Sequence, residues 1–97
     1  MKLGPHETRL DGRWLVDEKG AREDAVALRI RGLTDHYLTR IAADWSGWDV
    51  LYRDPSDGRY WERLYLESGL QGGGPPSLIL ATDEALESKY GVKADKK

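Results

Sequence analysis

The sequence contains no cysteine and no phenylalanine, and it carries no surplus of positive charge. Without cysteine the chain can form neither disulfides nor thiolate metal sites. The formal net charge of -2 argues against a general nucleic-acid binder, because such proteins normally have a basic surplus. No apolar run approaches the roughly 18 residues of a membrane span, and the opening stretch MKLGPHETRL lacks the apolar core of a signal peptide. We therefore expect a soluble, cytoplasmic protein with no metal, no cofactor, no membrane segment and no nucleic-acid partner.

The residues that are present indicate one small globular domain. A chain of 97 residues fits a single domain, and its 39% of hydrophobic residues suffices for a small core. The aromatic residues are four tryptophans and five tyrosines. Because their rings carry a polar group, they suit half-buried surfaces and interfaces.

The pattern of apolar residues, turns and caps predicts an α+β domain, in which about four strands form an antiparallel meander beside two short helices. We expect a loosely ordered lead-in over 1–9, the domain over 10–92, and a solvated tail over 93–97. The expected elements are a short strand in RLDGRWLV, a helix over 24–34, a strand in HYLTRIAAD, strands over 48–53, 59–67 and 77–82, and a helix in DEALESKYG.

Residues 24–34 admit two interpretations. Val26, Ile30 and Leu33 recur at helical spacing, whereas the same stretch also alternates between apolar and polar residues like a strand. Asp24 is a suitable N-cap and therefore favours the helix. For the second helix, Thr82 or Asp83 is the expected cap and Gly91 the expected stop.

The stretch QGGGPPS, residues 71–77, suggests a nucleotide-binding loop at first sight. A phosphate loop, however, requires Gly-Lys-Ser/Thr at the start of a helix. Here the glycines are followed by prolines, which lack the N–H groups that would bind an anion. We therefore predict a surface loop of fixed shape, formed by Gly72, Gly73, Gly74, Pro75 and Pro76.

Period-two geometry divides the strand candidate RYWERLYLE into two faces. One face interleaves cations with aromatic rings, a combination common at binding surfaces. It consists of Arg59, Trp61, Arg63 and Tyr65. The other face is expected to belong to the core and consists of Tyr60, Glu62, Leu64 and Leu66.

This facing places the carboxylate of Glu62 among apolar neighbours, where it must be paired or protonated. Its expected partner is an arginine or the N–H groups of the glycine loop. The alternative is a catalytic acid, so that Glu62, Arg59 and the glycine loop would form a small ligand-binding domain or an enzyme. The two histidines, His6 and His36, do not form a metal-ligand pattern, and no Gly-x-Ser-x-Gly motif is present.

Two turns combine tryptophan with acidic residues. Trp45 and Trp48 flank the turn at 46–47, where we expect Trp48 to pack in the core and Trp45 to be exposed. An exposed tryptophan is a candidate hot spot for protein binding. The acidic residues at this turn and the next are expected to be exposed and to steer a basic partner. They are Asp44, Asp49, Asp54 and Asp57.

Two motifs stand out in length, GW-x-x-LYRDP-x-DGRYWE over 47–62 and GGGPP-x-L over 72–78. Together with Gly12, Trp14, Asp24, Arg29-Ile30, Leu33 and Lys89-Tyr90, they resemble the immunity protein 27 family of bacterial polymorphic-toxin systems. The resemblance extends over about residues 3 to 92. The family usually continues from Trp-Glu into Tyr-Pro and often has His just before the glycines, whereas here Leu66 follows Tyr65 and Gln71 precedes Gly72.

The resemblance implies a protein that binds and neutralises a toxin made by the same bacterium. It implies association with a cognate toxin domain and no enzymatic activity. Of the residues above, Trp45 is the predicted anchor of that interface and the four aspartates are its predicted rim.

Overall fold

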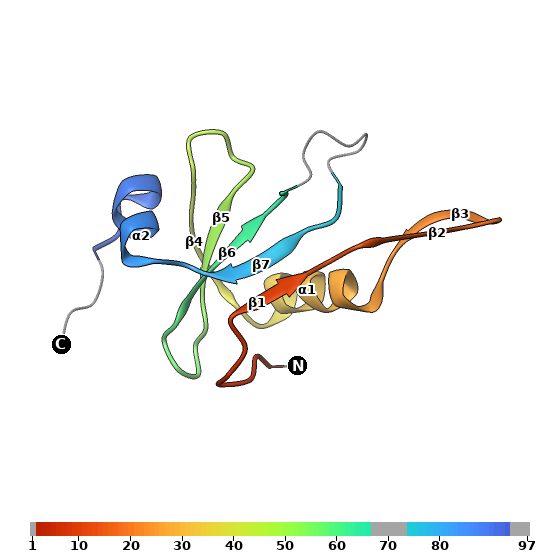
Figure 1. The fold of residues 1–97 in the computed structure, drawn as a ribbon. Helices are drawn as coiled ribbons and strands as arrows, with labels where there is room; N and C mark the ends of the chain where they lie inside the picture. The colour runs from red at the N-terminus through yellow and green to blue at the C-terminus, as the bar shows by residue number, and fades with distance from the viewer. Residues whose placement is uncertain (1, 67–73, 94–97) are drawn as a thin grey trace.

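A computed structural model describes residues 2–66 and 74–93 of the chain (Figure 1). The elements in order are β1 (Arg9–Asp11), β2 (Trp14–Asp17), β3 (Gly20–Glu23), α1 (Ala25–His36), β4 (Thr39–Ala43), β5 (Val50–Arg53), β6 (Tyr60–Leu64), β7 (Ser77–Leu80) and α2 (Asp83–Tyr90). This set of helices and strands confirms the α+β class.

The main sheet has five strands in the order β1-β7-β6-β5-β4, and every neighbouring pair is antiparallel. Strands β4 to β7 form the predicted meander, and β1 adds a fifth strand at its edge. Strands β2 and β3 form a separate two-stranded sheet. We call residues 14–23 the arm, because they extend away from the rest of the molecule (Figure 1).

One of the strands that were not predicted arises because the run RLDGRWLV divides at Gly12 into β1 and β2. The N–H of Gly12 donates to the carbonyl of Pro76 at 2.9 Å. A Cβ at this position would lie 2.6 Å from that carbonyl oxygen and 2.8 Å from the Cβ of Ala27. Only glycine fits such a close approach, and the chain changes sheets there.

Helix α1 begins where the capping argument predicts. The side chain of Asp24 accepts a hydrogen bond from the N–H of Ala27 at 2.8 Å, so the helical interpretation of this stretch is confirmed. The buried residues of α1 pack on one face of the main sheet. The resulting core contains Leu3, Ile30, Leu33, Leu38, Val50, Tyr52, Trp61 and Leu78.

Helix α2 covers the opposite face of the sheet. Thr82 caps it by accepting from the N–H of Ala85 at 3.1 Å, and Gly91 ends it with a φ of 66°. Because consecutive strand residues point to opposite faces, Trp61 faces α1 and Glu62 faces α2. Both residues are buried.

The predicted facing of β6 is therefore only half right. Glu62 is buried as expected, but Trp61, which was assigned to the exposed face, is completely buried. Leu66, which was assigned to the core, lies beyond the end of the strand and is 54% exposed. The period-two pattern assigns the residues of a strand to two faces, but it does not show which helix covers each face.

The lead-in is held more firmly than the sequence suggests. Leu3 is buried in the core. The guanidinium of Arg59 donates to the carbonyls of Glu7 at 2.9 Å and Gly4 at 3.0 Å, and Arg29 forms a salt bridge with Glu7 at 2.6 Å. These bonds attach the first residues to β6 and α1.

Of the predicted glycine loop, Gly74, Pro75 and Pro76 are described, and all three are buried. Gly72 and Gly73 lie outside the described residues, as do residues 94–97 of the expected tail. Among the helices that the structure describes, none combines the length and apolar character needed to cross a membrane.

Candidate protein-binding site

The β4–β5 loop, residues 44–49, is shaped by one carboxylate. An oxygen of Asp44 accepts from the hydroxyl of Ser46 at 2.7 Å and from the N–H of Gly47 at 3.0 Å. The backbone of Asp44 also donates to the carbonyl of Asp49 at 2.9 Å. The bond from Ser46 is the main reason that the pKa of Asp44 lies below its usual value. Asp44 therefore fixes the conformation of the loop.

This loop presents two tryptophans to solvent. Trp45 is 97% exposed, as predicted, but Trp48 is 60% exposed and does not belong to the core. Trp48 lies two residues before the start of β5 and packs edge-on against Tyr65, with ring centroids 5.8 Å apart. The guanidinium of Arg63 lies over Tyr65 at 5.1 Å and donates to the carbonyl of Trp48 at 3.3 Å. The result is an exposed aromatic surface on a fixed loop.

Asp54 is not the exposed turn residue that the sequence predicts, because it is completely buried. Its carboxylate accepts from the hydroxyl of Tyr37 at 2.6 Å and from the N–H of Ser56 at 2.8 Å. Burial raises the pKa of this carboxyl, but the hydrogen bonds from Tyr37 and Ser56 outweigh it and hold the pKa below its usual value. The buried carboxylate of Asp54 thus stabilises the 54–59 turn through these hydrogen bonds.

The other acidic residues are near the surface but are already paired. Asp49 accepts from the ammonium of Lys89 at 2.8 Å. Asp57 accepts from the Nε of Arg59 at 2.6 Å. Both carboxylates therefore offer less unbalanced negative charge than the sequence suggests.

Glu62 is partnered, as predicted, although by neither of the expected groups. Its Oε2 accepts from the ammonium of Lys89 at 2.7 Å and from the hydroxyl of Tyr90 at 2.8 Å. Burial would lower the pKa of Lys89, but its bonds to Asp49 and Glu62 raise it overall. Burial, followed by the bond to Glu62, raises the pKa of Tyr90. Lys89 and Tyr90 occupy the last turn of α2, and the sequence shows no signal that this turn lies over β6.

The structure does not bring together the residues of the enzyme alternative. Arg59 lies on the same face as Trp61, with its guanidinium 5.1 Å above the indole ring, whereas Glu62 lies on the opposite face under α2. No group of three or more metal-binding side chains occurs within the described ranges.

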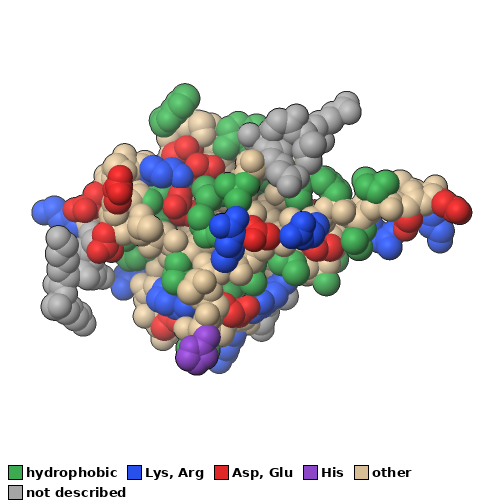
Figure 2. Space-filling model, viewed as in Figure 1, with side chains coloured by type: hydrophobic (Ala, Val, Ile, Leu, Met, Phe, Trp, Pro, Cys, Tyr) green, Lys and Arg blue, Asp and Glu red, His purple; other side chains and the backbone are tan. Residues whose placement is uncertain are grey.

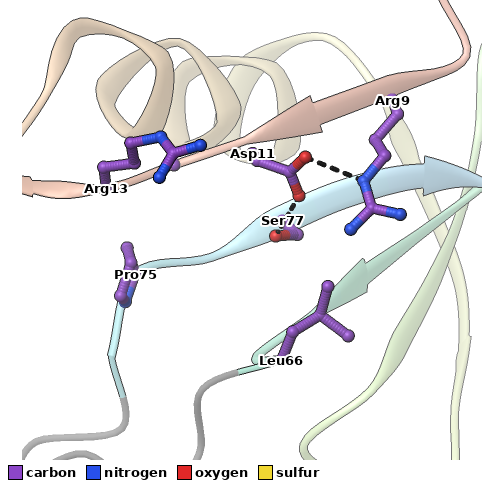
Figure 3. A pocket seen from close by; sticks show the side chains of 7 residues that line it. Arg9, Asp11, Arg13, Leu66, Pro75 and Ser77 are labelled. Carbon is purple, nitrogen blue, oxygen red and sulfur yellow. Dashed lines mark hydrogen bonds and ion pairs between the residues drawn. The ribbon is translucent and has the colours of Figure 1, made fainter.

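A small cavity lies beside the described end of the glycine loop (Figure 3). Its volume of about 210 Å³ is below the usual range of about 300–1,000 Å³ for ligand sites. Its polar groups also bind one another, since Asp11 accepts from Arg9 at 2.8 Å and from Ser77 at 2.9 Å. The described residues that line it are Arg9, Asp11, Gly12, Arg13, Leu66, Pro75 and Ser77, so Glu62 and Arg59 are not among them.

Comparison with known proteins gives one match. No curated protein and no solved structure matches the chain. A family model described as immunity protein 27 matches residues 16–82, which is more than half of the chain. The matched region begins within β2, contains the β4–β5 loop and β6, and ends at the cap of α2. The chain belongs to the immunity protein 27 family.

Proposed function

We propose that this chain binds a cognate toxin domain in a stoichiometric complex, in the cytoplasm of the bacterium that makes it, and thereby neutralises the toxin. Membership of an immunity protein family supports this class of function. The observation that supports the location of the interface is Trp45, which is 97% exposed on a loop fixed by Asp44. A large side chain on an ordered loop loses little conformational freedom on binding, so more of its contact energy contributes to affinity.

In this proposal Trp45 and Trp48 form the centre of the interface. Asp44, Asp49 and Asp57 remain the proposed acidic rim, whereas buried Asp54 is not part of it. Since Asp49 and Asp57 are paired with cations, we expect the rim to affect the association rate modestly and the tryptophans to determine the lifetime of the complex.

The test is the affinity of Trp45→Ala for the cognate toxin domain. Truncating a central anchor typically costs 2 kcal/mol or more, so we expect binding to weaken by roughly 30-fold or more. The matched control is Leu28→Ala, which shortens an exposed apolar residue on α1 and should bind like wild type. Thermal melting of both variants reports whether the fold is preserved.

Wild-type affinity in Trp45→Ala would place the interface elsewhere on the chain. The same measurement with Asp44→Asn, Asp49→Asn would then show whether the rim has any part in it. Failure of the wild-type chain to bind or inhibit the toxin domain would contradict the proposed function itself.

A further inference from the structure

The arm carries apolar side chains that the isolated chain leaves open to solvent. Val16 is 77% exposed, Leu15 43% and Trp14 37%. The radius of gyration is 14.0 Å, compared with about 12.5 Å expected for a compact chain of this length, in keeping with an element that projects from the body. Figure 2 shows hydrophobic side chains on this projecting element. A two-stranded sheet with no other layer is marginally stable in water.

The register of the arm separates an apolar face from a polar one. Trp14 pairs with Glu23 and Val16 pairs with Ala21, so these four side chains share one face. The other face contains Leu15 and an ion pair between Asp17 and Arg22. The first face is therefore apolar along the projecting part of the arm, with a single acid at its base.

That acid connects the apolar face to the β4–β5 loop. Both carboxylate oxygens of Glu23 accept from the Nε of Arg31, at 2.6 and 2.8 Å. The pKa of Arg31 is raised mainly by its bond to Glu23 and to a smaller extent by Tyr65, whose ring contacts Trp48. The base of the arm thus lies near Trp48, one of the two exposed tryptophans of the β4–β5 loop.

The exposed area decides which kind of partner fits. Complete burial of Trp14 and Val16 would remove only about 220 Å² of the apolar face from water, whereas a stable interface needs about 800 Å² from each partner. A second copy that contacted only the arm would therefore be held weakly. Including the exposed area of Trp45 and Trp48 raises the total to about 650 Å². A partner that contacts both regions therefore covers most of the area that a stable complex needs.

We propose that the arm is a second toxin-binding element, so that one toxin domain contacts the β4–β5 loop and the apolar face of the arm at the same time. This proposal rests on the proposed function. The toxin surface that meets the arm is an apolar patch, because Trp14, Val16 and Ala21 are apolar and Glu23, which shares their face, is already bonded to Arg31.

The experiment measures binding kinetics of the full chain with the cognate toxin domain. The variant Trp14→Ser, Val16→Ser should bind at least about tenfold more weakly, mainly through faster dissociation. The matched control is Leu15→Ser, which makes the same kind of change on the opposite face and should bind within about threefold of wild type. If the double variant melts at a lower temperature than wild type, the binding of Val16→Ser alone tests the proposal. Val16 is the most exposed of the three residues, so its substitution should disturb the fold least.

Three results would overturn the arm proposal and leave the proposed function intact. The first is wild-type binding by the arm variants together with a loss of binding in Trp45→Ala. The second is an equal loss in Leu15→Ser, because the effect would then not belong to the apolar face. The third is a dimer of the isolated wild-type chain, seen by light scattering, that Val16→Ser converts to a monomer.

Discussion

Two antiparallel strand pairs of this molecule are built from similar residues and have opposite surroundings. In β5 the residues Val50, Leu51 and Tyr52 are all buried, and their partner strand contributes the buried Trp61. In the arm, every residue of β2 is exposed, although the strand reads Trp-Leu-Val-Asp. The difference lies in what covers each pair: α1 and α2 cover the two faces of β5 and β6, and no helix that the structure describes covers the end of the arm (Figure 1).

The comparison shows that strand-forming sequence and contribution to stability are separate properties. Both pairs form an antiparallel backbone ladder, but only the covered pair removes large apolar side chains from water. The free energy of folding is therefore concentrated in the body, and the arm can vary its surface with little effect on the fold. Such a division suits a protein in which a stable scaffold presents an exposed recognition element.

The largest expected effect is on stability, and it is seen by truncating one tryptophan in the β5–β6 pair and one in the arm. Trp61→Ala should lower the free energy of unfolding by about 3–5 kcal/mol, because it leaves a large cavity between the sheet and α1. Trp14→Ala should lower it by less, about 1–2 kcal/mol, because the residue is 37% exposed and only part of its surface is removed from water. Urea unfolding of the two variants beside wild type measures both changes. Similar losses in the two variants would show that the arm belongs to the same cooperative core.

The next effect concerns the polar contacts that hold α2 on the sheet. Glu62→Ala leaves the ammonium of Lys89 with one carboxylate fewer and leaves the hydroxyl of Tyr90 without its acceptor. Breaking a buried pair typically costs about 3–5 kcal/mol, and since Lys89 is one-third exposed we expect a loss of about 3 kcal/mol. Glu87→Ala, at an exposed position of α2, is the control and should stay within about 0.5 kcal/mol of wild type. An unchanged melting temperature in Glu62→Ala would contradict the structural role of this cluster.

Local signals in the sequence predicted a large part of the fold. Asp24, Thr82 and Gly91 fix helix ends through bonds or backbone angles within a few residues, so both helices were predicted close to their observed limits. The division of the first strand was missed, because the role of Gly12 depends on Pro76, which is distant in the sequence. The third strand was missed for a related reason, since its residues have little apolar character and pair only with β2.

The candidate site was predicted in part. The exposure of Trp45 follows from its position at a turn, whereas Trp48 and Trp61 were assigned the wrong way round. The residue type is the same at both positions, so it does not distinguish them. The packing of α1 on the sheet determines which of the two tryptophans fills the core. The exposed face of the arm was not predicted, because burial of a strand depends on neighbours that a single sequence does not name.

The smallest expected effect is a pH dependence of stability that a carboxylate in the lead-in should show and one in the arm should not. The salt bridge with Arg29, assisted by the N–H of Gly4, lowers the pKa of Glu7 from 4.5 to about 2. A carboxyl whose pKa is lower in the folded state stabilises the fold above its unfolded pKa and loses that contribution as pH falls towards the folded value. Because about a third of the Glu7 and Arg29 side chains is exposed, we expect a contribution on the order of 1 kcal/mol.

Glu7→Gln should therefore be less stable than wild type by about this amount at pH 7, and the difference should shrink between about pH 5 and pH 2. Glu18→Gln, at the exposed tip of the arm, should differ little from wild type at either pH. Urea unfolding of the three proteins at both ends of this range makes the comparison. A gap between wild type and Glu7→Gln that stays constant with pH would show that the Glu7–Arg29 bond does not hold the lead-in to the body.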